Sequence, residues 1–183
     1  TYHAPTTLTD ALAIAAEHKA VVVAGGTDFY PALARGQTPP DLLDVTQVRE
    51  MQGITRQTDY IRFGGASRWS EIIAADLPPA FDSLKQAARQ VGSIQIQNTG
   101  TLAGNLCTAS PAADGIPPLL TLDAKVELTT MNTRRRIALR EFLTGARQTQ
   151  RAPDELLTAI LVPKPSSTAH AAFEKLGGRT YLV

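Results

Sequence analysis

The sequence predicts an α+β fold built from two lobes. Residues 1–57 alternate helical and strand patterns around a glycine pair, which is typical of a small parallel α/β unit. Residues 58–175 contain two runs of alternating polarity, 125–130 and 134–139, separated by a short turn, which is typical of an antiparallel hairpin. We therefore expect a small parallel α/β lobe followed by a larger mixed or antiparallel lobe, with the boundary in the polar stretch 56–59.

Four elements are expected in the small lobe, in the order helix, strand, helix, strand: residues 8–16, 20–24, 28–35 and 42–45. Thr7 or Thr9 can cap the first helix. The first strand is a block of valines flanked by alanines, which predicts a fully buried strand of a parallel sheet. The second helix can begin at Thr27 or Asp28, and Gly36 would end it.

The larger lobe is expected to combine strands and helices. The strand candidates are residues 60–63, 125–130, 134–139, 156–162 and 171–173, and the helix candidates are residues 70–75 and 79–91. Residues 97–114 are rich in hydroxyl, amide and glycine residues and lack a periodic apolar pattern. We expect this segment to be a polar loop that its leucines hold in the core.

The composition excludes several classes of protein. The chain has 183 residues, with 18 lysines and arginines against 17 acidic residues, and this net charge of +1 gives no support for nucleic-acid binding. No apolar run reaches the ~20 residues that a membrane-spanning helix needs. Cys107 is the single cysteine, so the chain cannot form an internal disulfide or hold an iron–sulfur cluster by itself. We expect a cytoplasmic protein that binds neither nucleic acid nor a membrane.

No metal site is expected either. The three histidines lie far apart in the sequence, away from any carboxylate pattern, and ordinary surface or structural roles are expected for them: His3, His18 and His170.

A glycine pair between the first strand and the second helix is a candidate anion site. Gly25 and Gly26 place backbone N–H groups at the start of a helix, and the absence of a Cβ lets a phosphate approach closely. A plain strand-to-helix turn would need the same small residues. The chain has neither a Walker A loop nor the three-glycine Rossmann spacing. An unrelated mononucleotide-binding α/β protein stays open as an alternative that rests on this turn alone.

The polar segment 97–114 is a second candidate site. Its neutral hydrogen-bond donors could surround a diphosphate, and Asp114 could accept hydrogen bonds from sugar hydroxyls. A long surface loop of turn-forming residues is the simpler interpretation, but the apolar residues spaced through the segment favour a packed binding loop.

These motifs together resemble those of the FAD-binding subunit of the molybdenum hydroxylases, a family that includes the medium subunit of carbon monoxide dehydrogenase and the FAD domain of xanthine dehydrogenase. The resemblance rests on Ala-Gly-Gly-Thr-Asp at residues 24–28, Thr-Leu-Ala-Gly-Asn at residues 101–105 and Ala-Ser-Pro-Ala-Ala-Asp at residues 109–114. It continues through segments between residues 122 and 163 and ends at residues 173–175 with Arg179. Several separated motifs in one order are more specific than one glycine turn.

The resemblance implies a two-subdomain FAD-binding fold of the vanillyl-alcohol oxidase and p-cresol methylhydroxylase type. It implies that the two glycine motifs hold the diphosphate, that Asp114 contacts FAD, that Leu157 lines the isoalloxazine and that Lys175 lies near the flavin. The implied cofactor-binding residues are Val23, Ala24, Gly25, Gly26, Thr27, Asp28, Phe29, Thr101, Ala103, Gly104, Asn105, Asp114, Leu157 and Lys175. No side chain is expected to act as a catalytic acid or base, because the cofactor carries the chemistry.

The resemblance also implies an FAD-dependent oxidoreductase subunit that works in a heterotrimer. In the family, iron–sulfur clusters on a small subunit, supplied by a molybdopterin-containing large subunit, pass electrons through FAD to an acceptor such as NAD, oxygen or a quinone. Family members carry a further C-terminal domain. Residues 176–183 are therefore expected to be the start of a domain that this chain lacks.

Two positions depart from the family pattern. Ala103 stands where the more familiar form has a glycine, and Gln97 stands where many relatives have an arginine. If position 103 required a positive φ, the alanine would be strained, and we expect that only Gly104 needs that freedom. The two departures support one alternative, a flavin-free scaffold subunit of the same complex.

Overall fold

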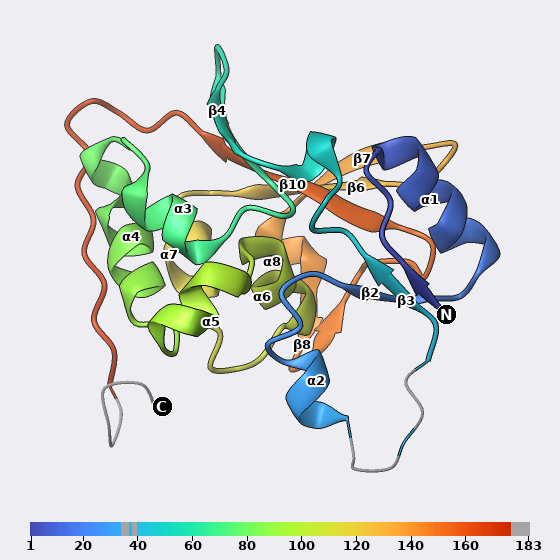
Figure 1. Ribbon diagram of the computed structural model, residues 1–183. Helices are drawn as coiled ribbons and strands as arrows, with labels where there is room; N and C mark the ends of the chain where they lie inside the picture. Colours follow the sequence, from blue (N-terminus) through green and yellow to red (C-terminus); the bar gives the residue numbers. More distant parts are fainter. Residues whose placement is uncertain (34–36, 38–39, 177–183) are drawn as a thin grey trace.

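The computed structural model describes residues 1–33, 37 and 40–176 (Figure 1). Its smaller sheet has three parallel strands in the order β1-β3-β2. These strands are β1 (Tyr2–His3), β2 (Val21–Val23) and β3 (Leu42–Asp44). The predicted parallel lobe is confirmed, and its sheet includes β1, which is too short to produce a periodic pattern in the sequence.

Helix α1 (Leu8–Glu17) packs on this small sheet. Thr7 caps the helix, because its hydroxyl accepts a hydrogen bond from the Asp10 N–H at 3.2 Å. The buried residues of the helix join a core that also contains residues of the larger lobe: Ala11, Leu12, Ala15, Leu43, Val45, Val48, Met51, Ala66 and Leu156. The two lobes therefore share packing along one side of the small sheet.

The larger sheet has five antiparallel strands in the order β4-β5-β10-β6-β7. They are β4 (Ile54–Arg56), β5 (Tyr60–Gly64), β10 (Leu156–Pro163), β6 (Lys125–Thr129) and β7 (Arg134–Ala138). Strand β10 lies in the centre, and its first seven residues are buried. The predicted hairpin is confirmed as β6 and β7.

Short helices cover one face of this sheet (Figure 1). They are α3 (Trp69–Ala74), α4 (Asp82–Arg89), α5 (Ile94–Thr99), α6 (Leu102–Thr108), α7 (Ile116–Thr121) and α8 (Leu139–Phe142), with a 3₁₀ turn at Pro79–Phe81. A second 3₁₀ turn, Arg49–Met51, packs instead against α1. Large side chains from both layers form one buried cluster, including Phe63 and Ile160 from the sheet and Trp69, Phe81 and Leu102 from the helices. This cluster is the main core, and it fixes the helices that carry the site.

The structure corrects four predictions of secondary structure. Residues 97–114 are largely helical, because α5 and α6 fall in the segment that was expected to be a loop. The predicted strand 171–173 has no regular structure. Val21 is 39% exposed, so β2 is not a fully buried strand. The second helix is α2 (Phe29–Ala32), which ends at Leu33, and the predicted end at Gly36 lies outside the described residues.

The helices of the segment 97–114 were missed for a physical reason. Helix α6 buries Leu102, Ala103 and Leu106, but it has only seven residues, which is too few for helical periodicity to stand out in the sequence. Tertiary packing thus overrides the low helix propensity of these residues.

The division of the chain at about residue 57 remains a prediction. Strand β4 lies before this point and yet pairs with β5 of the larger sheet. Residues 177–183 of the expected C-terminal extension lie outside the described residues.

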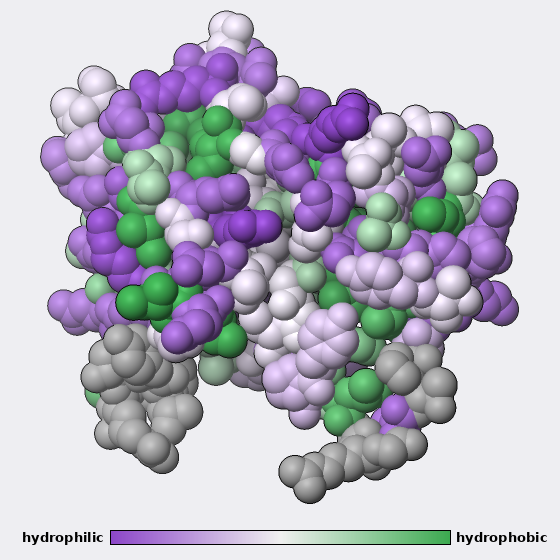
Figure 2. All heavy atoms as spheres, in the orientation of Figure 1, coloured by the Kyte–Doolittle hydropathy of each residue, from purple (hydrophilic) through white to green (hydrophobic). Residues whose placement is uncertain are grey.

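Hydrophilic residues are spread over the face shown in Figure 2, and hydrophobic ones form separate groups. Within the described ranges, no helix combines the length and apolar character needed to cross a membrane.

Candidate cofactor-binding site

A cavity of about 800 Å³ lies between the small sheet and the helices of the larger lobe. Its walls come from the β2–α2 connection, from α5 and α6, and from the hairpin of β8 (Leu143–Gly145) and β9 (Gln148–Thr149). Most of the predicted cofactor-binding residues line it: Val23, Ala24, Gly25, Gly26, Thr27, Asp28, Phe29, Thr101, Gly104 and Asn105. The volume lies within the range of about 300–1,000 Å³ that is usual for ligand pockets.

The first glycine motif forms an open turn between β2 and α2. Gly26 has a φ of +66°, a left-handed conformation that favours glycine. The described residues offer no intramolecular hydrogen-bond acceptor to the backbone N–H groups of Gly25, Gly26 and Thr27. These three residues are only partly buried, so their N–H groups are open to a partner in the cavity. Three successive donors without one, at the wall of a cavity, fit an anionic ligand such as a diphosphate.

Gly25 brings the first motif into contact with the main chain directly before the second motif. A Cβ at this position would collide with the backbone carbonyl group of Thr99 and would lie 2.8 Å from Gly100 Cα. Glycine is therefore needed at position 25 because two segments of main chain meet there, and not because of its φ.

The second glycine motif is the first turn of α6. Thr101 is the N-cap, and its hydroxyl accepts a hydrogen bond from the Gly104 N–H at 3.1 Å. A Cβ on Gly104 would come within 4 Å of one described atom outside the helix backbone, Thr101 Oγ1 at 3.0 Å, and would otherwise extend into open space beside the cavity. Neither Ala103 nor Gly104 has a positive φ. The expectation that Gly104 needs that freedom is wrong, and Ala103 is an unstrained buried helix residue.

Polar side chains connect the two motifs to each other and connect α6 to the segment before α7. Thr108 Oγ1 donates a hydrogen bond to Asp28 Oδ2 at 3.2 Å, which ties α6 to the start of α2. Asn105 Oδ1 accepts one from the Gly115 N–H at 3.2 Å, which fixes the connection from α6 to α7. These bonds hold the glycine-lined wall in a defined shape before any ligand binds.

Two arginines that the sequence analysis missed also line the cavity, Arg147 and Arg151. Arg147 lies in the β8–β9 turn with a φ of +56°, and its N–H donates to the Ala109 carbonyl at 2.8 Å. Ala109, the C-cap of α6, is itself left-handed with a φ of +45°. Such costly conformations cluster at functional sites. An isolated arginine in a loop leaves no periodic signal, so only its place in the fold reveals it.

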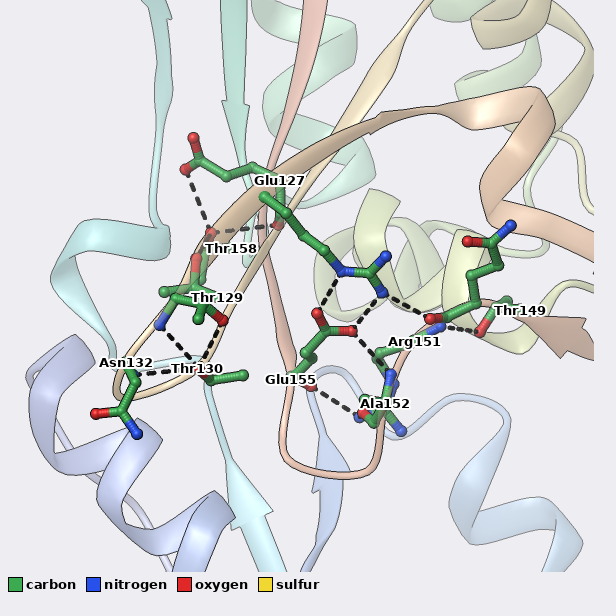
Figure 3. A network of polar contacts seen from close by, with 12 residues as sticks. Glu127, Thr129, Thr130, Asn132, Thr149, Arg151, Ala152, Glu155 and Thr158 are labelled. Atoms are coloured by element: carbon green, nitrogen blue, oxygen red, sulfur yellow. Dashed lines mark hydrogen bonds and ion pairs between the residues drawn. The ribbon is translucent and has the colours of Figure 1, made fainter.

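A partly buried ion pair between Arg135 and Glu155 supports the wall that carries Arg151, and Figure 3 shows the polar contacts of Glu155 with its neighbours. The Arg135 guanidinium donates two hydrogen bonds to the Glu155 carboxylate, at 2.6 and 2.8 Å, and the Glu155 side chain is 6% exposed. Arg151 Nη1 donates to the Glu155 carbonyl oxygen at 2.8 Å, and the Ala152 N–H donates to the Glu155 carboxylate. The hydrogen bonds from Arg135 hold the pKa of Glu155 below its usual range, against the opposing effect of burial. Glu155 is therefore ionised at neutral pH.

Cys107 lines the cavity but is chemically quiet. Burial raises the pKa of its thiol to about 11, and the positive charge of Arg151 opposes this shift only in part. The thiol is thus protonated at neutral pH, and a protonated thiol is a poor nucleophile and metal ligand.

Four predicted residues lie outside the main cavity. Ala103 and Leu157 line an adjoining space of about 100 Å³, which shares the wall at Gly104. Asp114 and Lys175 line a separate hollow of about 360 Å³ and form an ion pair with each other at 3.0 Å. Contacts of Asp114 and Lys175 with FAD therefore remain predictions.

The fold and this cavity together define a class of protein: an α+β domain whose cavity suits a cofactor with an anionic part. Backbone donors without a partner among the described residues, space beside Gly104 and two arginines fit a flavin dinucleotide. Residues 1–165 match the family described as the FAD-binding domain in molybdopterin dehydrogenase, and the chain belongs to this family. FAD is the cofactor of this family, as the motifs predicted.

Individual relatives agree with this membership. The chain is 33% identical over 193 residues to the nicotinate dehydrogenase FAD-subunit of Eubacterium barkeri, an alignment that covers 100% of this chain and 64% of the relative. It is 34% identical over 187 residues to caffeine dehydrogenase subunit beta of Pseudomonas sp. (strain CBB1), covering 97% and 62%. The chain thus spans slightly less than two thirds of the length of these relatives.

A solved structure agrees with the fold. A chain of carbon monoxide dehydrogenase from Hydrogenophaga pseudoflava superposes with a TM-score of 0.88 at 26% identity, covering 98% of this chain and 64% of that chain. The predicted family and the predicted two-part α+β fold are therefore confirmed. Both named relatives are subunits of dehydrogenases, and the first is described as an FAD-subunit.

Proposed function

We propose that this chain binds FAD in the cavity between its lobes and serves as the electron-transfer flavin unit of a molybdopterin-dependent hydroxylase or dehydrogenase. The observation that carries the proposal is the set of three successive backbone N–H groups at Gly25, Gly26 and Thr27, which have no acceptor among the residues that the structure describes. They lie across the same cavity from Gly104, the position where a side chain would enter the open space.

The residues of this chain bind and orient the cofactor. The N–H groups of the first motif would donate to the diphosphate, and the missing side chain at Gly104 would let the diphosphate approach α6. Arg147 and Arg151 would add positive charge to the same wall. Val23, Ala24, Phe29, Ala103 and Leu157 would supply the apolar and small surfaces, and Thr101 and Asn105 would hold the first turn of α6.

Asp28, Asp114 and Lys175 complete the proposed binding set. Asp28 fixes the end of the first motif through Thr108. The ion pair of Asp114 with Lys175 would have to open, or shift as a unit, for either residue to contact the flavin. When bound, FAD supplies the redox chemistry, and the chain supplies position and exclusion of water.

Partner subunits would complete the electron path. We propose an iron–sulfur small subunit and a molybdopterin-containing large subunit on the donor side, and NAD, oxygen or a quinone as acceptor. Two relatives are themselves named as subunits of dehydrogenases. The single cysteine, Cys107, leaves this chain without the set of thiolates that an iron–sulfur cluster needs, so the clusters would belong to another chain.

Reconstitution of the protein at its full natural length tests the cofactor. We expect one FAD per chain by absorbance, and Gly104→Leu should weaken FAD binding by at least about 10-fold, because the side chain fills space meant for the cofactor. Ala16→Leu, on the exposed side of α1, is the control and should bind FAD normally. A wild-type protein that never retains flavin would contradict the proposal, and tighter binding of AMP than of FAD would favour the mononucleotide alternative.

Co-purification with the neighbouring subunits tests the partners. A complex that contains the two other subunits together with flavin supports the electron-transfer role. The same complex without flavin would favour the scaffold alternative.

A further inference from the structure

Two histidines and an aspartate meet at the edge of the small sheet, away from the cofactor cavity. One donor atom from each of His3, His18 and Asp41 lies within 4.8 Å of the other two. The two imidazole rings face each other with centroids 4.8 Å apart. The sequence suggested that the histidines are isolated, and the structure corrects this, because residues 3, 18 and 41 come together only through the pairing of β1, β2 and β3.

The topology explains the juxtaposition. His3 lies in β1, His18 is the C-cap of α1 just before β2, and Asp41 directly precedes β3. The carbonyl of Asp41 accepts a hydrogen bond from the Val21 N–H at 2.7 Å, which holds the starts of β2 and β3 together. Parallel strands begin at a common edge of their sheet, and the cluster lies at this edge. The first glycine motif begins at the opposite edge, at the carboxyl end of β2.

His3 provides an independent sign of a missing ligand. Its Nε2 atom is buried and has no hydrogen-bond partner within the part of the chain that the structure describes. Buried polar atoms nearly always have partners, and an unsatisfied one calls for an explanation such as an ion. The other two members remain accessible, since the side chains of His18 and Asp41 are each 44% exposed.

We propose that His3, His18 and Asp41 bind a divalent transition-metal ion, with zinc as the expected occupant. Two imidazoles and one carboxylate suit zinc, whereas magnesium and calcium prefer oxygen ligands. Donor atoms around one tetrahedral zinc ion, bound at about 2.0–2.1 Å, are about 3.4 Å apart. The donor atoms here lie within 4.8 Å of one another, and rotation of the exposed His18 and Asp41 side chains would bring them to the shorter spacing. Water would complete the coordination.

The existing contacts of Asp41 are compatible with this site. The Thr1 amino group contacts Asp41 Oδ1, and Oδ2 has no hydrogen-bond partner among the described residues. Glu17, whose carboxylate lies 3.9 Å from His18 Nε2, adds negative charge nearby. A bound ion would link β1, the end of α1 and the start of β3, and would thereby stabilise the small lobe that carries the first glycine motif.

Titration calorimetry with zinc chloride tests the site on the full natural chain, free of affinity tags and treated with a chelator. We expect saturable 1:1 binding and a rise in the unfolding temperature with zinc, and none with magnesium. His18→Gln and Asp41→Asn change exposed residues, so the fold should survive. Each should weaken zinc binding by at least about 10-fold, within the range for lost metal-site interactions.

His170→Gln is the matched control, because this exposed histidine lies in the segment after β10 and outside the cluster. It should leave zinc binding unchanged. The proposal is wrong if wild-type protein shows no saturable zinc binding, if His18→Gln binds as tightly as wild type, or if the control loses the site. None of these outcomes depends on FAD, so the result is separate from the proposed flavin function.

Discussion

The two glycine motifs lie on the same cavity but need glycine for different reasons. In the first motif, Gly26 adopts a left-handed φ and Gly25 touches the backbone of Thr99 and Gly100, directly before the second motif. In the second motif, Gly104 is an ordinary helical residue whose missing side chain leaves space beside the cavity. The first motif therefore requires glycine for the fold itself, and under the proposed function the second would require it for the ligand. Substitutions in the first motif should therefore mainly lower the stability of the protein, whereas substitutions at Gly104 should mainly lower its affinity for FAD.

Gly25→Ala should have the largest effect on stability. The new Cβ meets backbone atoms of Thr99 and Gly100, which cannot rotate away, so the two motifs must move apart. We expect a loss of about 3 kcal/mol in the free energy of unfolding, together with loss of FAD binding. Chemical denaturation and flavin absorbance measure the two effects, and a stable variant that retains FAD would show that the motifs need not touch.

Gly26→Ala should destabilise less. The cost comes from the left-handed φ, about 1–2 kcal/mol, because the colliding group is the ring of Tyr30, which is half exposed and can move. Gly26→Asn should recover part of this loss, since asparagine tolerates the left-handed region better. Thermal unfolding of both variants tests the order, and equal stability of the two would mean that steric contact and not φ sets the cost.

Thr101→Ala removes the N-cap of α6 and should cost about 1 kcal/mol. Thr7→Ala removes the same kind of cap from α1, so it serves as a control with a similar loss of stability. The two variants should differ in FAD affinity, which falls for Thr101→Ala because the cap orients the wall at Gly104. Equal FAD affinity in both would show that the cap supports only the helix.

Gly104→Ala should change stability least and still weaken FAD binding. Alanine favours a helix interior over glycine by up to about 1 kcal/mol, and this gain opposes the cost of the small shift that Thr101 Oγ1, 3.0 Å from the new Cβ, must make. We expect an unfolding temperature equal to or above that of wild type with reduced FAD affinity, measured by calorimetry. A clear loss of stability would remove the distinction between the two motifs.

The sequence predicted the fold class and most of the cavity wall because these depend on local signals. The valine block, the glycine pair after it and the alternating hairpin each appear within a few residues, and they placed β2, the first motif and the β6–β7 pair correctly. The order of the motifs also sufficed to recognise the family. Sequence alone likewise determined that one cysteine cannot support a metal cluster in this chain.

Only the tertiary structure decided how distant residues meet. It turned the expected polar loop into α5 and α6, because burial of Leu102 and Leu106 outweighs the weak helix propensity of the segment. It brought Arg147 and Arg151 to the cavity, paired Asp114 with Lys175, and joined His3 to His18. Such contacts depend on the long-range pairing of strands and packing of helices, and a pattern confined to neighbouring residues does not encode them.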